Sequence, residues 1–129
     1  MRGVSADRCS KVANALYAGG VRLMEITYNQ KEPASWQQTA ETIGALTEEF
    51  GEKMFFGAGT VTSVELVELT HAYGGKYIIS PDTNVDVIKR TVELGIGGNF
   101  AKKAWIDAGE FDKLTEAAKT MVEIIKSVQ

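Results

Sequence analysis

The chain has one cysteine, one histidine and no long apolar run. Cys9 has no second thiol with which to form an internal disulfide, and a zinc site is not expected around it. No apolar stretch reaches the length of a membrane-spanning helix, and the N-terminus does not resemble a signal peptide. These absences predict a cytoplasmic protein with no membrane partner.

Basic residues are scattered along the chain. Fourteen Lys and Arg stand against seventeen Asp and Glu, for a net charge of −3, so the sequence has no electrostatic footprint for nucleic acid. A local nest of backbone amides would still be able to bind a small anion, whatever the global charge. The lone histidine, His71, falls late in a predicted helix, and we interpret it as structural.

Short apolar runs alternate with stretches of helical periodicity. At 129 residues and 44% apolar content, the chain is long enough for one domain, residues 1–129, with a sizeable core. Continuous apolar strands that alternate with helices are typical of a parallel sheet covered by helices. The predicted strands are Val21–Ile26, Met54–Phe56, Tyr77–Ile79 and one that begins at Ile96, with Val4 closing a clipped first strand.

Capping residues and glycines delimit the predicted helices. Ser5 caps the first helix, and Pro33 and Ser35 open the second. Helices are expected over Ala6–Ala18, from the Pro33 turn to Phe50, over Ser63–Tyr73 and Val85–Leu94, around Trp105, and over Phe111–Val128.

Two features indicate chemistry. In the first, the apolar pair Phe55-Phe56 runs into Gly57-Ala58-Gly59-Thr60, where glycines permit backbone angles and close approaches that a Cβ would forbid. A tight strand-to-helix turn is the alternative interpretation of this motif. The second is Glu25, a carboxylate inside an apolar strand, which should face a polar interior or pair with another group.

Several motifs together carry a family resemblance. They are Arg2-Gly3, Gly19-Gly20-Val21, Leu23-Met24-Glu25-Ile26-Thr27, Gly57-Ala58-Gly59-Thr60-Val61 and Ile79-Ser80-Pro81. In order and spacing the chain resembles the bacterial 2-dehydro-3-deoxy-phosphogluconate and 4-hydroxy-2-oxoglutarate aldolases. The resemblance runs continuously from Arg2 to Gly95, and the stretch from Gly97-Gly98 to the C-terminus looks like the end of the same family.

The resemblance implies a (β/α)8 barrel, commonly trimeric, with its active site at the C-terminal ends of the strands. Such enzymes are lyases that cleave 2-keto-3-deoxy sugar acids to pyruvate and an aldehyde, glyceraldehyde 3-phosphate for 2-dehydro-3-deoxy-6-phosphogluconate. The reaction proceeds through a lysine Schiff base. No metal or cofactor is implied, because the iminium itself serves as the electron sink.

The resemblance also implies roles for particular residues. Glu25 would be the proton shuttle, and Asn29 stands where many members have a substrate-binding arginine. Further substrate contacts would come from Arg2, Thr60 and Pro81, and a phosphate cradle after the last strand from Gly97, Gly98 and Asn99.

The chain is short for this fold. A complete barrel needs roughly 200 residues, so 129 residues hold about four to five βα units plus the C-terminal helix, a partial barrel. The family segment that would fall between Gly95 and Ile96 carries the Schiff-base lysine, and no lysine here replaces it. Lys76 starts a strand, and Lys102 and Lys103 follow the glycine cradle, where they would either reach an anion or, as is usual for exposed lysines, stay solvated.

Three hypotheses stay open. The chain belongs to an aldolase with a longer polypeptide, it is a short relative that binds a small oxo acid or phosphate without cleaving it, or it is a structural, oligomerising half-barrel. An open four-stranded sheet would expose its inner face and its edges, so the chain alone should associate or unfold. We therefore favour the first hypothesis.

Overall fold

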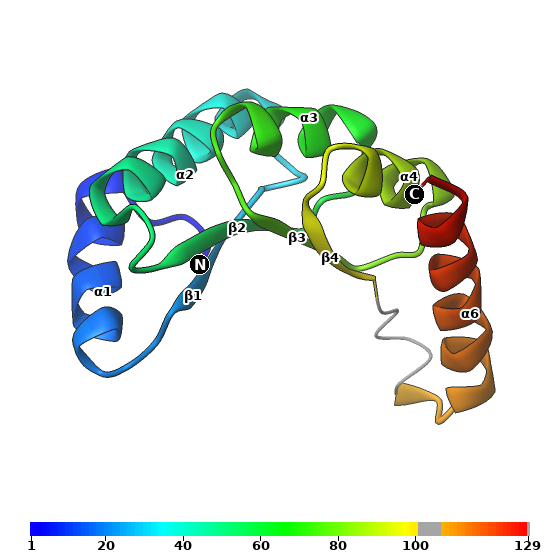
Figure 1. The fold of residues 1–129 in the computed structure, drawn as a ribbon. Coiled ribbons are helices and arrows are strands. Elements are labelled where there is room, and N and C mark those ends of the chain that lie inside the picture. The colour runs from blue at the N-terminus through cyan, green and yellow to red at the C-terminus, as the bar shows by residue number, and fades with distance from the viewer. Residues whose placement is uncertain (101–106, 129) are drawn as a thin grey trace.

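The computed structural model describes residues 1–100 and 107–128 of the chain. Four parallel strands form one sheet whose spatial order follows the sequence, β1-β2-β3-β4. They are β1 (Leu23–Thr27), β2 (Phe55–Gly59), β3 (Tyr77–Ser80) and β4 (Gly97–Phe100). A helix connects each pair of neighbouring strands, as parallel pairing requires (Figure 1).

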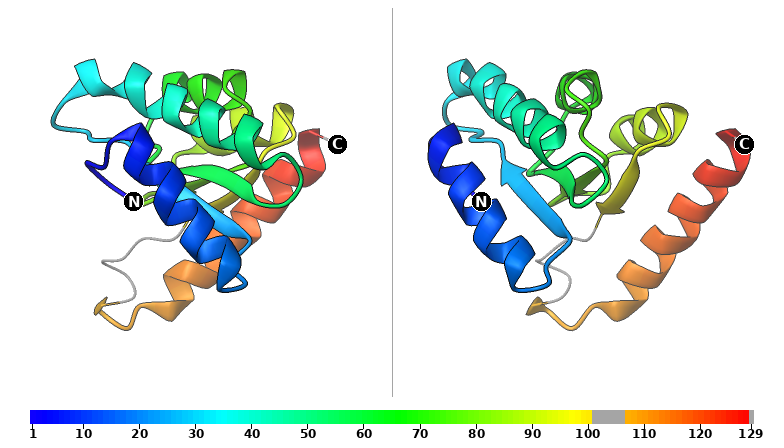
Figure 2. Two further views of the ribbon diagram at one scale, coloured as in Figure 1. Left: turned by 90° about the vertical axis from the view of Figure 1, so that its left-hand side faces the viewer. Right: turned by 60° about the vertical axis from the view of Figure 1, so that its left-hand side comes forward.

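The helices form an arc around the convex side of the curved sheet (Figures 1 and 2). Each packs on the next along the chain, from α1 to α2, α3, α4 and α6. Their bounds are α1 (Ala6–Ala18), α2 (Trp36–Phe50) after the short helix η1 (Pro33–Ser35), α3 (Val64–Ala72), α4 (Val85–Glu93) and α6 (Phe111–Val128). Within the described residues no helix covers the concave side, so the predicted partial barrel is confirmed.

The core lies between the sheet and the helices. Alternate strand residues point into it, among them Met24 and Ile26 of β1 and Phe56 of β2, and they meet the apolar faces of α2, α3 and α4. The helix residues in this core are Ile43, Leu46, Phe50, Leu66, Val67, Val87 and Ile88. Burial of this one face is what holds the helices against the sheet.

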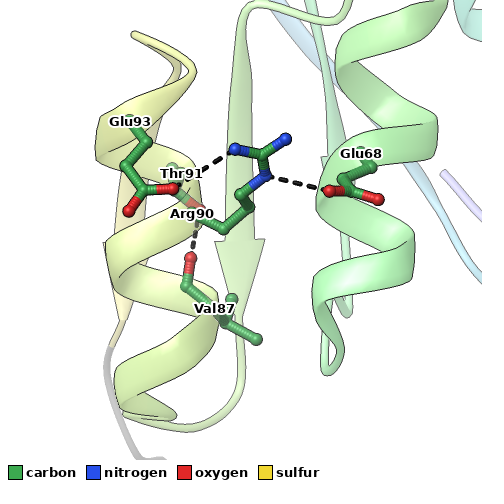
Figure 3. A network of polar contacts seen from close by, with 5 residues as sticks. All are labelled: Glu68, Val87, Arg90, Thr91 and Glu93. Carbon is green, nitrogen blue, oxygen red and sulfur yellow. Dashed lines mark hydrogen bonds and ion pairs between the residues drawn. The ribbon is translucent and has the colours of Figure 1, made fainter.

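Local polar contacts fix the helix ends and join neighbouring helices. The Ser63 hydroxyl accepts the amide of Leu66, and the Asn84 side chain accepts the amides of the first turn of α4. Arg90 of α4 bridges to Glu68 of α3 at 2.9 Å and to Glu93 at 3.2 Å (Figure 3). Because these side chains are partly exposed, the pairs orient the two helices rather than stabilise them strongly.

The structure corrects three strand predictions. β1 begins at Leu23 rather than Val21, and β2 extends through Gly59 instead of stopping at Phe56. Val4 lies in the loop before α1, and the residue that pairs with β1 is Met1. The Met1 amino group donates to the Glu25 carbonyl at 2.7 Å, and the Thr27 amide donates to the Met1 carbonyl at 2.6 Å.

The predicted helix bounds agree with the structure within one or two residues for α1, α2, α3, α4 and α6. The short helix expected around Trp105 lies outside the described residues. None of the helices in residues 1–100 and 107–128 is both long and apolar enough to cross a membrane.

Candidate active site on the concave face

The candidate site lies on the concave face of the sheet. Parallel register places Glu25 of β1 beside Gly57 of β2, and Gly57 beside Tyr77 of β3. Two residues further along, Thr27 lies beside Gly59, and Gly59 beside Ile79. Since side chains alternate between the two faces of a strand, all of these residues face away from the helices.

Two glycines of β2 make room for side chains from the neighbouring strands. A Cβ built on Gly59 would lie 2.7 Å from Oε1 and 2.8 Å from Oε2 of Glu25. A Cβ built on Gly57 would lie 2.5 Å from the Tyr77 carbonyl oxygen and 2.7 Å from Cδ2 and Cε2 of its ring. The Glu25 carboxylate therefore lies over Gly59, and the Tyr77 ring lies over Gly57.

This arrangement corrects the interpretation of the glycine motif as a turn. Gly57, Ala58 and Gly59 are strand residues, and neither glycine has a positive φ. Their role is to supply space on the concave face, which side chains of this chain occupy, and a ligand's close approach to this backbone stays a prediction. The residue with left-handed backbone is Thr60, with φ of 58°.

Within the described part of the chain, the Glu25 carboxylate has one hydrogen-bond partner. Its Oε1 accepts the Thr27 hydroxyl at 3.3 Å. Its Oε2 is buried and has no hydrogen-bond partner among the described residues. An unsatisfied buried carboxylate oxygen is costly, and in native structures such a group commonly serves a ligand or a reaction.

The charge of this carboxylate acts on Tyr77. Burial, and secondarily the negative charge of Glu25, raise the pKa of Tyr77 to about 12. The phenol is therefore neutral at physiological pH. The sequence does not reveal that Tyr77 and Glu25 are near each other, because they lie on β3 and β1, on either side of Gly57 of β2.

Thr60 is held in its strained conformation by contacts from two other loops. Gln30 donates from Nε2 to the Thr60 carbonyl at 2.7 Å, and Arg2 donates from Nη2 to the Thr60 hydroxyl at 3.4 Å. A β-branched residue with positive φ is rare and is commonly found at functional sites. The structure thus brings Arg2 and Thr60, two of the predicted substrate contacts, together at the C-terminal edge of the sheet.

Asn29 lies near this edge, on a separate cavity of about 260 Å³. Arg2, Asn29 and Thr27 line the cavity together with polar side chains of α2. The Asn29 Oδ1 accepts the amide of Lys31 at 3.2 Å. Arg2 therefore connects the cavity that contains Asn29 with the loop that contains Thr60.

A family model described as KDPG and KHG aldolase matches residues 3–97. The chain belongs to this aldolase family. It is 30% identical over 96 residues to the 2-dehydro-3-deoxy-6-phosphogalactonate aldolase of Escherichia coli K12, covering 74% of this chain and 44% of that protein. It is 33% identical over 85 residues to the 2-dehydro-3-deoxy-phosphogluconate aldolase of Treponema pallidum, covering 66% of this chain and 37% of that protein.

Solved structures of the aldolase family show the same fold. A native KDPGal structure matches with a TM-score of 0.65 at 28% identity, over 76% of this chain and 45% of that one. The KDPG aldolase of Legionella pneumophila matches with a TM-score of 0.66 at 21% identity, over 78% of this chain and 45% of that one. The chain thus spans less than half the length of the aldolases that it matches.

The remaining predicted site residues are Pro81, Gly97, Gly98 and Asn99. Pro81 is exposed and directly follows β3. Gly97 and Gly98 lie within β4, not after the last strand, because this segment pairs with β3. The Gly97 amide donates to the Lys76 carbonyl, so it is not part of an open amide nest. Asn99 belongs to the same strand.

No lysine occupies any of the four strands. Lys76 immediately precedes β3, at the N-terminal end of the sheet as predicted, and it is exposed. Lys102 and Lys103 lie outside the described residues. Within residues 1–100 and 107–128 no group of three or more histidine, cysteine or acidic side chains could hold a metal ion.

Proposed function

We propose that this chain forms part of a lyase that cleaves a 2-keto-3-deoxy sugar acid to pyruvate and an aldehyde. The observation that carries the proposal is the Glu25 carboxylate on the concave face, with its Oε2 buried and without a partner. Membership of the aldolase family supports the reaction class. The exposed apolar residues of the same face support a longer barrel, because further strands would cover Leu23, Phe55 and Ile79.

The chemistry assigns Glu25 the movement of protons. In a Schiff-base aldolase, an uncharged lysine attacks the keto carbon, and the resulting iminium accepts electrons from the C–C bond that breaks. A carboxylate beside the reacting carbons takes a proton from one intermediate and returns it to another. The lysine is not identified in this chain, so we place it in the family segment that would fall between Gly95 and Ile96.

The substrate contacts follow from the C-terminal edge of the sheet. Thr60 would bind the pyruvyl carboxylate with its hydroxyl, Arg2 would neutralise an acidic group, and Pro81 would line the pocket. Asn29 offers a neutral amide, which lacks the permanent charge and the bidentate geometry of arginine. We propose a phosphorylated 2-keto-3-deoxy sugar acid as substrate, and the phosphate role of Gly97, Gly98 and Asn99 stays a prediction.

A second candidate is a short relative that binds a small oxo acid or phosphate without cleaving it. The absence of lysine from the strands of the sheet favours this alternative. In that case Glu25 and Thr60 would still bind the ligand, and no covalent adduct would form. The homotrimer and the cytoplasmic location, implied by the resemblance and by the composition, also stay predictions.

Intact mass spectrometry after incubation with pyruvate and borohydride distinguishes the two candidates. A protein heavier than 14.0 kDa that carries a reduced pyruvyl adduct would support the aldolase. A 14.0 kDa chain without an adduct, but stabilised by pyruvate, would support the binding protein. A chain that shows neither response would contradict both.

A further inference from the structure

Two side chains from opposite neighbours converge on β2. The Glu25 carboxylate comes from β1 and lies over Gly59, while the Tyr77 ring comes from β3 and lies over Gly57. These glycines are two residues apart on the same face, which corresponds to about 6.6 Å along a strand. The Tyr77 ring therefore lies next to the Glu25 carboxylate, on its N-terminal side.

The Tyr77 ring therefore borders the site on the side nearer the N-terminal ends of the strands. The carboxylate lies toward the C-terminal end of the strands, where Thr60 and Arg2 meet, and the ring lies over Gly57, two residues nearer the N-terminal end of β2. Below the ring the face is open, since Phe55 is 44% exposed and Leu23 is 61% exposed. Without the ring, the Glu25 side chain would be free to bend toward this open region.

We propose that Tyr77 is a positioning residue for Glu25, and that its ring, seated on Gly57, holds the carboxylate over Gly59. The inference rests on the proposed function and adds to it a residue that acts through Glu25. Tyr77 lies on the concave face, whereas the hydrophobic core lies on the other face of the sheet. Packing of the core therefore does not explain its position.

The ring, rather than the hydroxyl, carries this role. The close approach to Gly57 is made by Cδ2 and Cε2. The only hydrogen-bond donor to the Glu25 carboxylate among the described residues is Thr27. Phenylalanine at position 77 should therefore preserve the positioning of Glu25, while alanine should not.

The test is pyruvate binding to the full chain, measured by calorimetry for three variants. Tyr77→Phe should bind within about twofold of the parent, and Tyr77→Ala should bind about tenfold more weakly, which corresponds to 1.4 kcal/mol. Phe55→Ala is the matched control, because it removes another aromatic ring from the same face, at the register position beside Leu23 and not beside Glu25. It should bind like the parent.

Two results would overturn the positioning role of Tyr77 without affecting the proposed function. One is equal pyruvate binding by Tyr77→Ala and the parent, and the other is an equal loss of binding in Phe55→Ala. A parent chain that does not bind pyruvate would instead reject the proposed function, and with it the positioning role.

A spectroscopic titration checks the geometry without any ligand. Ultraviolet absorbance reports tyrosinate formation, and Tyr77→Phe identifies the contribution of Tyr77 by its loss. Because Glu25 contributes to the raised pKa of Tyr77, Glu25→Gln should lower that pKa. An unchanged Tyr77 titration in Glu25→Gln would show that the two groups are not neighbours and would refute the positioning role.

Discussion

Alanine at each of the two β2 glycines should differ in its effect on stability. In Gly57→Ala the new methyl would meet the Tyr77 backbone carbonyl at 2.5 Å, about half an ångström inside the 3.0 Å that real contacts respect. Strand β3 would have to move. In Gly59→Ala the atoms in the way belong to the Glu25 carboxylate, at 2.7 to 2.8 Å. That group is the end of a flexible side chain and can turn aside.

The magnitudes follow from this difference. Overpacking against fixed backbone costs typically about 1–3 kcal/mol, so Gly57→Ala should lose that much stability. Replacing glycine with alanine stabilises a compatible strand by about 0.4–1 kcal/mol through the unfolded state. In Gly59→Ala this gain offsets most of the cost of moving Glu25. The net change should stay within about 1 kcal/mol, while the carboxylate leaves its position.

Urea unfolding followed by tryptophan fluorescence measures the change in stability, and pyruvate binding measures the displacement of the Glu25 carboxylate. We expect Gly57→Ala to unfold at clearly lower urea, and Gly59→Ala to unfold near the parent but bind pyruvate more weakly. Greater destabilisation by Gly59→Ala than by Gly57→Ala would refute the assignment of these glycines. So would pyruvate binding by Gly59→Ala that equals binding by the parent.

Three further predictions concern single contacts. Thr60→Gly should be about 1–2 kcal/mol more stable than Thr60→Ala in urea unfolding, because both remove the hydroxyl and only glycine relieves the positive φ; equal stability would contradict the strain. Tyr28→Phe should cost about 1 kcal/mol by the same assay, because it removes the buried 3.0 Å contact with the Thr70 hydroxyl, and no loss would argue against that bond. The raised pKa of Tyr77 disfavours its ionisation in the folded state, so its contribution to stability is complete below pH 10 and is lost as the pH rises toward 12. Unfolding at a series of pH values should show a steeper alkaline loss for the parent than for Tyr77→Phe, and parallel curves would refute this linkage.

Much of the fold is local and was therefore predictable from the sequence. The boundary residues Ser5 and Pro33 and the periodic apolar faces place the helices within one or two residues of their observed bounds. The alternation of apolar strands with helices predicts the parallel sheet. The motifs around Glu25 and Gly57 were sufficient to indicate the aldolase family, which the family model confirms.

The site was predicted only in part, because its geometry depends on contacts between strands. Gly57 and Gly59 resembled turn residues, since a sequence cannot show that side chains from β1 and β3 occupy the space above them. Gly97 resembled a loop residue until pairing with β3 made it part of a strand. Tyr77 carried no sequence signal at all, as its proximity to Glu25 arises from residues 52 positions apart in the chain.

The sequence by itself determined the elements, their order, the family and the choice of Glu25 as a candidate site residue. These depend on local propensity and on motifs within a few residues. Tertiary structure decided which residues share the concave face and where the Glu25 carboxylate lies. The physical reason is strand register, which aligns Glu25, Gly57 and Tyr77 across three strands and leaves space only where a side chain is missing.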